Sequence, residues 1–171
     1  TDGSEAMRID SVGSVGIGTA PSTWASNVYD ALQIGESIGV GTIAARVDGI
    51  NQVNFGLNWN YDGGATLTYV ATSFATNYAQ EAGTHRWSHA ASGTAGGALT
   101  FTESMRIDSS GNLLVGTTDA AVGVGNTNTG LSLANSGYAA FSRTGSATQA
   151  TLFINKNTNL GPILDFRTNG S

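Results

Sequence analysis

The sequence predicts an all-β fold made of tandem repeat modules. Hydrophobic residues make up 40% of the 171 residues, which is more than a disordered chain contains. Val, Ile, Leu and aromatic residues recur at every second position between turns rich in Gly, Asn and Ser, and this is the period of a β-strand. An internal repeat is the third observation. Residues 73–80 are the best helical candidate, without the period and caps of a convincing helix.

The repeat consists of residues 5–19, EAMRIDSVGSVGIGT, and residues 103–117, ESMRIDSSGNLLVGT. Nine of these fifteen positions are identical, and the two copies begin 98 residues apart. A weaker similarity relates residues 31–34 to residues 130–133. We therefore predict a first β module over residues 1–102 and a second, truncated one over residues 103–171.

Each copy of the repeat predicts a β-hairpin. Met7 and Ile9 share one face of its first strand, and Gly13 lies in the turn, where glycine readily adopts a positive φ. Asp10, like Asp108 in the second copy, precedes the turn and is placed to accept hydrogen bonds from turn amides. The other equivalent positions are Met105, Ile107 and Gly111. One hairpin cannot bury its own apolar face, so we expect these apolar side chains to be buried against another chain.

Composition excludes several classes of protein. Charged residues make up only 11% of the chain, the net charge is −5, and no cluster of Lys and Arg is present, so we expect no nucleic-acid partner. No stretch approaches the roughly 18 to 20 apolar residues that span a bilayer, so we expect no membrane insertion. Cysteine is absent, which excludes disulfides and cysteine metal sites.

The repeated segments resemble a motif of bacteriophage tail fibres and related virion appendages. That motif reads Met-Arg-Ile-Asp-Ser-Ser-Gly-Asn, then a hydrophobic pair and Gly-x-Gly-Thr, and residues 7–19 and 105–117 are similar to it. Leu114 departs from it where a glycine is usual. The resemblance implies an extracellular homotrimeric fibre in a virion, elongated and bound to other tail proteins. Each module would then have a hairpin stem and a small β-sandwich-like body, and the segment would present a receptor-binding surface to a host cell-surface glycan.

We expect no enzymatic activity and no cofactor, but two alternative functions stay open. One is a capsule or polysaccharide depolymerase similar to tailspike enzymes, and the other is a repeat of a bacterial surface adhesin. A depolymerase needs a pair of carboxylates. Four of the twelve acidic residues belong to the repeated hairpins, and the others carry no motif. These four are Glu5, Asp10, Glu103 and Asp108. We therefore assign no catalytic residue.

Two histidines have a spacing that suits metal ligation on a helix. His85 and His89 lie four residues apart, but no acidic residue occupies a matching position among the neighbouring Gly and Ala. We therefore predict two loop histidines and no bound metal.

Eight of the fourteen aromatic residues lie between Phe55 and Phe101. One interpretation is that they fill the core of a β body. The other is that Trp59, Tyr61 and Trp87 include exposed rings that stack on sugars, because such rings combine a large rigid face with a polar group. We predict that at least one of these three residues is partly exposed and contacts the glycan.

Overall fold

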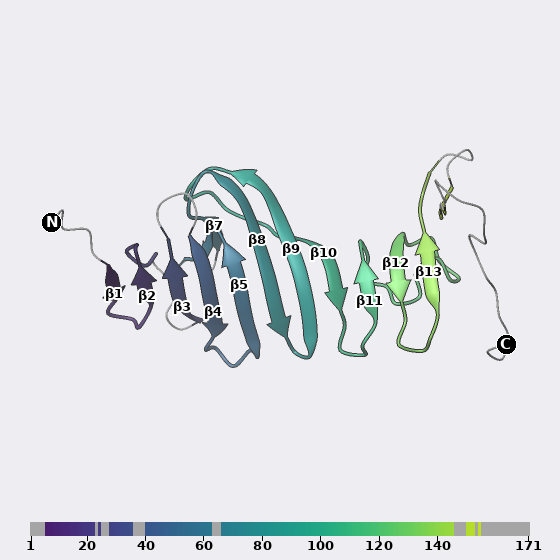
Figure 1. Cartoon of the computed structure of the whole chain (residues 1–171), viewed down its shortest axis with the longest axis horizontal. Coiled ribbons are helices and arrows are strands. Elements are labelled where there is room, and N and C mark those ends of the chain that lie inside the picture. The colour runs from purple at the N-terminus through teal and green to yellow at the C-terminus, as the bar shows by residue number, and fades with distance from the viewer. Residues whose placement is uncertain are drawn as a thin grey trace, which may run out of the picture.

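The structure is a computed structural model that describes residues 6–22, 24, 28–35, 40–62, 66–145, 150–152 and 154. This part of the chain is all-β, with thirteen strands in two sheets (Figure 1). The strands are β1 (Met7–Ile9), β2 (Val15–Ile17), β3 (Tyr29–Ile34), β4 (Gly41–Arg46), β5 (Gln52–Leu57), β6 (Trp59–Tyr61), β7 (Leu67–Tyr69), β8 (Ser73–Glu81), β9 (Thr84–Gly93), β10 (Thr102–Ile107), β11 (Leu113–Val115), β12 (Gly130–Leu133) and β13 (Ala139–Ser142). Within these ranges, no helix has the length and apolar character needed to cross a membrane.

Eleven strands form one large sheet, and β6 and β7 form a small second sheet. The large sheet follows the chain order from β1 to β13 and omits only the small sheet, so its strands lie side by side in Figure 1. The helical candidate, residues 73–80, is part of β8. The predicted module boundary between residues 102 and 103 falls within β10, which pairs with β9 and β11. The sheet therefore continues across that boundary.

The two repeated segments are β-hairpins with the same local geometry. Their strands pair in equivalent antiparallel registers. Oδ1 of Asp10 and Oδ1 of Asp108 each accept two turn amides, all at 2.9 Å. The turn glycines Gly13 and Gly111 have φ values of +93° and +85°, where L side chains are disfavoured. The prediction of strand, turn and strand is therefore confirmed for both copies.

The chain leaves the two hairpins in different directions. In the first copy β2 pairs with β3 in parallel, with Gly16 opposite Gln33. In the second copy β11 pairs with β12 in antiparallel fashion, with Leu114 opposite Ser132. The predicted correspondence between residues 31–34 and 130–133 therefore holds for position in the sheet and fails for strand direction.

One face of the large sheet carries small side chains and supports a second layer. This layer contains β6 and β7 together with Trp24, and β7 lies behind β4 and β5 in Figure 1. Ala44 and Ala75 of the large sheet are completely buried in the resulting core. The buried core consists of Trp24, Tyr29, Ala31, Ala44, Trp59, Tyr69, Ala75, Ala90 and Leu99. Alanines in the sheet leave the volume that the rings of the second layer fill, as close packing requires.

Asn58 connects the large sheet to the second layer. It lies between β5 and β6 with a φ of +64°, a region in which Asn is enriched among non-glycine residues. Its buried Nδ2 donates to the carbonyl oxygens of Ala71 at 3.1 Å and Phe74 at 2.9 Å. Its Oδ1 accepts the Ala71 amide at 2.7 Å. One side chain therefore ties the turn out of β5 to the start of β8.

A glycine in β5 makes room for the central ring of the core, and this gives a test of the packing. A Cβ built on Gly56 would lie 1.8 Å from Nε1 of Trp59, whereas a Cβ on Gly41 would lie no closer than 3.8 Å to any neighbour. We expect Gly56→Ala to destabilise the protein by about 1–3 kcal/mol, the usual cost of overpacking. The matched control Gly41→Ala should melt close to the wild type. Equal melting temperatures of the two variants by circular dichroism would contradict this packing.

The aspartate of the second hairpin gives a pH-dependent test. Hydrogen bonds from the Asn112 side chain, and from the amides of Asn112 and Ser110, lower the pKa of Asp108. A pKa below the unfolded value of about 3.9 stabilises the fold above that pH, and this stability is lost as pH falls through the folded pKa. Asp108→Ala should therefore lower the melting temperature at pH 7, and the difference from wild type should shrink toward pH 2. Ser109→Ala is the control, and a gap that persists at pH 2 would refute the mechanism.

Candidate assembly and binding surfaces

A row of apolar side chains crosses all eleven strands on the face of the large sheet opposite the second layer. We call this row the apolar strip. Its members are directly paired neighbours: Ile9, Val15, Leu32, Ile43, Phe55, Tyr78, Trp87, Met105, Val115, Leu131 and Phe141. At a strand spacing of about 4.8 Å, ten intervals make the strip roughly 48 Å long. Each strand contributes one apolar residue to it, and none of these residues is charged.

Much of the apolar strip and its flanks is exposed in the single chain. Met7 and Ile9 are 59% and 64% exposed, Ile107 is also exposed, and Met105 is half-buried. These four residues are therefore not buried within one chain, and their burial against another chain stays a prediction. The physical reason is that the second layer covers the opposite face of the sheet. The apolar strip therefore contains both exposed and half-buried apolar side chains, and large apolar patches of this kind are uncommon on the surfaces of monomeric proteins.

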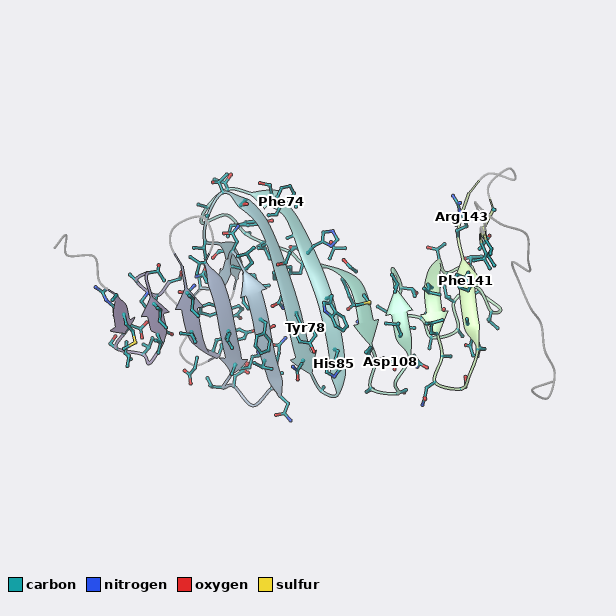
Figure 2. All side chains as sticks on the ribbon, viewed as in Figure 1. Phe74, Tyr78, His85, Asp108, Phe141 and Arg143 are labelled. Atoms are coloured by element: carbon teal, nitrogen blue, oxygen red, sulfur yellow. The ribbon has the colours of Figure 1, made fainter. Side chains whose placement is uncertain are left out.

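Aromatic residues form the middle of the apolar strip. The ring centroids of Phe55 and Tyr78 are 6.1 Å apart, and those of Tyr78 and Trp87 are 5.0 Å apart. Tyr78 also stacks on His85, and its hydroxyl lies 2.5 Å from Nδ1 of that histidine (Figure 2). Trp87, a predicted glycan contact, is half-buried in this row. It therefore belongs to the apolar strip, away from the second layer.

The two histidines lie in a strand, so the prediction of loop histidines is wrong. Both are in β9, which runs through the Gly- and Ala-rich sequence around them. Nδ1 of His89 lies 2.8 Å from Oγ of Ser104, and His85 bonds Tyr78 as described above. In the described part of the chain, no three His, Asp or Glu side chains gather closely enough to hold a metal ion.

On the covered face, a groove of about 660 Å³ lies between the second layer and the large sheet. We call it the polar groove. Its aromatic wall consists of Tyr29, Trp59, Tyr61 and Phe101. Its polar floor consists of Gln52, Asn54, Asn77, Arg86, Ser88 and Glu103. The polar groove and the apolar strip therefore use opposite faces of the same strands.

Trp59 is part of the core, and of the three residues predicted as possible glycan contacts it is the one whose side chain is buried. Its side chain is only 1% exposed. The ring packs edge-on against Trp24 at 5.5 Å and Phe101 at 6.0 Å between centroids. Since its indole is enclosed on these sides, Trp59 shapes the wall of the polar groove from behind.

Tyr61 is the predicted residue that combines partial exposure with a place in the polar groove. It is half-buried at the end of β6 and lines the wall of the groove. Its ring lies 5.3 Å from the Tyr29 ring in a tilted arrangement. Tyr29 in turn donates its hydroxyl hydrogen to Oε1 of Gln52 at 3.2 Å. The contact with Tyr29 gives the Tyr61 ring a supported position beside the floor.

The charged side chains at the floor are paired. Arg86 forms an ion pair with Glu81, and Arg106 holds Glu103 through Nε and Nη2 at 2.6 Å each. The hydrogen bond to Glu103 raises the pKa of Arg106 above its usual range, so this guanidinium keeps its charge. Paired in this way, the arginines and carboxylates contribute little net charge to the polar groove.

The polar floor was missed by sequence reasoning, although a signal for it exists. Asn54 precedes Phe55, Asn77 precedes Tyr78, and Ser88 follows Trp87. Neighbouring strand residues face opposite sides of a sheet, so each aromatic residue of the apolar strip has a polar neighbour on the other face. Reading the polar positions with the same period would have found these residues.

The polar groove combines ring surfaces with donors and acceptors of hydrogen bonds, which suits a ligand that is rich in hydroxyl groups. Comparisons with protein-family models, curated proteins and solved structures found no match to the chain. The interpretation of the groove therefore depends on its geometry and on the chemistry of its side chains.

The different burial of the two wall residues gives a test. Trp59→Ala should destabilise the protein by about 3–5 kcal/mol, because it removes a buried ring and leaves a cavity. Tyr61→Ala should cost less, because the half-buried ring at the edge leaves a space that solvent can fill. Urea denaturation followed by fluorescence measures both free energies of unfolding. An equal loss in the two variants would show that Tyr61 is as much a core residue as Trp59.

Proposed function

We propose that the chain is a structural and adhesive segment of a homotrimeric bacteriophage tail fibre, located in the extracellular part of a virion. In this proposal it spaces the fibre and presents a host receptor-binding surface. The observation that carries the proposal is the apolar strip, which crosses every strand of the large sheet. The resemblance of the two hairpins to the tail-fibre motif supports the assignment to tail fibres. The apolar strip supports assembly of several copies of the chain.

The strip favours a partner of the same sequence. Burial of apolar surface stabilises an assembly by about 25 cal/mol per Å². Copies arranged around an axis parallel to the strip bring each residue close to its own counterpart, so a continuous apolar row complements itself by symmetry. Because the strip contains no charged residue, its burial in such an assembly would not require a charge to lose its hydration. The tail-fibre resemblance supports three copies around this axis.

The opposite face supports the adhesive part of the proposal. If the apolar strip lies at the axis, the second layer and the polar groove lie on the outer surface of the fibre. A surface held by rigid strands is well suited to recognition. This arrangement would leave the outer surface accessible to the host ligand and to the neighbouring tail proteins.

The paired hairpins support the modular part of the proposal. They occupy separate places along one sheet and have equal registers and turns. Repeat proteins add such units along one direction and bury each against its neighbours. Modules over residues 1–102 and 103–171 would then follow one another along the fibre axis.

A non-enzymatic role is the better proposal for the polar groove. A glycosidase needs one carboxylic acid that donates a proton and a second carboxylate. Glu81 and Glu103, the two carboxylates beside the groove, each bind an arginine. This arrangement favours binding over the acid–base roles that a depolymerase would need.

Assembly through the apolar strip can be tested by substitution. Light scattering of the wild-type segment at micromolar concentration should give about three times the mass of one chain. Phe55→Glu and Val115→Glu should each lower this mass, because a buried carboxylate in the apolar interface is costly. Ser110→Glu places the same charge in an exposed turn and should leave the mass unchanged. A folded wild-type monomer would sink the proposal, and a stable dimer would overturn the threefold arrangement.

A further inference from the structure

We propose that the polar groove is the binding site of a neutral oligosaccharide, with Tyr61 and Phe101 as its ring platform and Asn77 and Ser88 as partners of its hydroxyl groups. The inference rests on the proposed adhesive function and deepens it, because it names the site and the charge class of the glycan. The volume of the groove, its aromatic wall and polar floor, and its charge balance support this assignment.

The size and the two sides of the groove fit a sugar. Its volume of about 660 Å³ lies within the range of about 300–1,000 Å³ that is usual for ligand sites. A pyranose ring has an apolar face of C–H groups and an edge of hydroxyl groups. Tyr61 and Phe101 are half-buried on one side of the groove, and the amides and hydroxyl of the floor lie on the other. The sugar would therefore meet a matching surface on each side.

The floor has hydrogen-bonding capacity that its own contacts do not use. Nδ2 of Asn77 donates to Oδ1 of Asn54 at 2.8 Å. Oδ1 of Asn77 and Nε of Arg86 are buried without a hydrogen-bond partner in the described part of the chain. Buried polar atoms are normally paired. A modest rotation of either side chain toward the groove would let a sugar hydroxyl pair with it, because a hydroxyl group both donates and accepts.

The charge balance selects a neutral sugar over an acidic one. Recognition of a carboxylate or phosphate group depends on a guanidinium that can form a bidentate pair with it. Arg86 is already paired with Glu81, and Arg106 with Glu103. The chain also carries a net charge of −5, which disfavours the approach of an anion. Sialic acid, uronate and phosphate groups are therefore poorer ligands than neutral hexoses and N-acetylhexosamines.

Binding can be measured on an array of neutral oligosaccharides built from glucose, galactose, mannose and N-acetylglucosamine, beside matched oligosaccharides that carry uronic or sialic acid. The wild-type segment should bind members of the neutral set. Tyr61→Ala and Asn77→Ala should each weaken this binding at least tenfold, whereas Tyr61→Phe should retain it because the ring remains. Phe74→Ala is the matched control, because this aromatic residue is 66% exposed on β8 and lies outside the groove lining (Figure 2).

Three results would overturn the inference: no binding to the neutral set by folded protein, a preference for the acidic set, or binding that survives in both groove variants. Light scattering on the same samples separates this inference from the proposed assembly. Assembled protein that binds no neutral sugar overturns the groove assignment alone. A monomer that binds the sugars and loses binding in Tyr61→Ala overturns the assembly alone and supports the groove.

Discussion

Strand register is the constraint on which both surfaces of this molecule depend. Because neighbouring strand residues face opposite sides, a slip of one position in β8 would move Tyr78 into the polar groove and Asn77 into the apolar strip. The two faces demand side chains of different size, so each strand has one register that satisfies both. The large sheet keeps a continuous row of directly paired apolar residues from β1 to β13, and this row is the visible result of the constraint.

The covered face shows how small residues determine where large ones can lie. A Cβ on Gly93 would lie 2.2 Å from the Tyr69 ring, and one on Gly56 would overlap the indole of Trp59. Ala44 and Ala75 belong to the same buried cluster as these rings and have no exposed surface. The small residues of the sheet therefore leave the space in which the rings of the second layer pack. These rings then form one wall of the polar groove.

Sequence reasoning reached the parts of the fold that local chemistry controls. An aspartate before a turn and a glycine within it predicted both repeated hairpins, and period-two hydrophobicity predicted an all-β chain. It did not predict which face the second layer covers, because that choice depends on contacts between distant strands. Trp59 and Trp87 were therefore grouped together although they lie on opposite faces. A third turn was also missed: Gly137 has a φ of +94°, as in the repeated turns, but Ala134 stands where they have aspartate.

The two surfaces are mechanically linked through the strands they share. Phe55 and Asn54, Tyr78 and Asn77, and Trp87 and Ser88 are three pairs of chain neighbours, each with one residue in the strip and one in the floor. In the proposed assembly, burial of the strip would restrain the backbone of β5, β8 and β9. The same restraint would hold the floor residues at fixed spacing, and a site that is ordered before binding loses less entropy when the ligand arrives. Assembly would thus strengthen recognition on the outer face, with no groove residue contacting another chain.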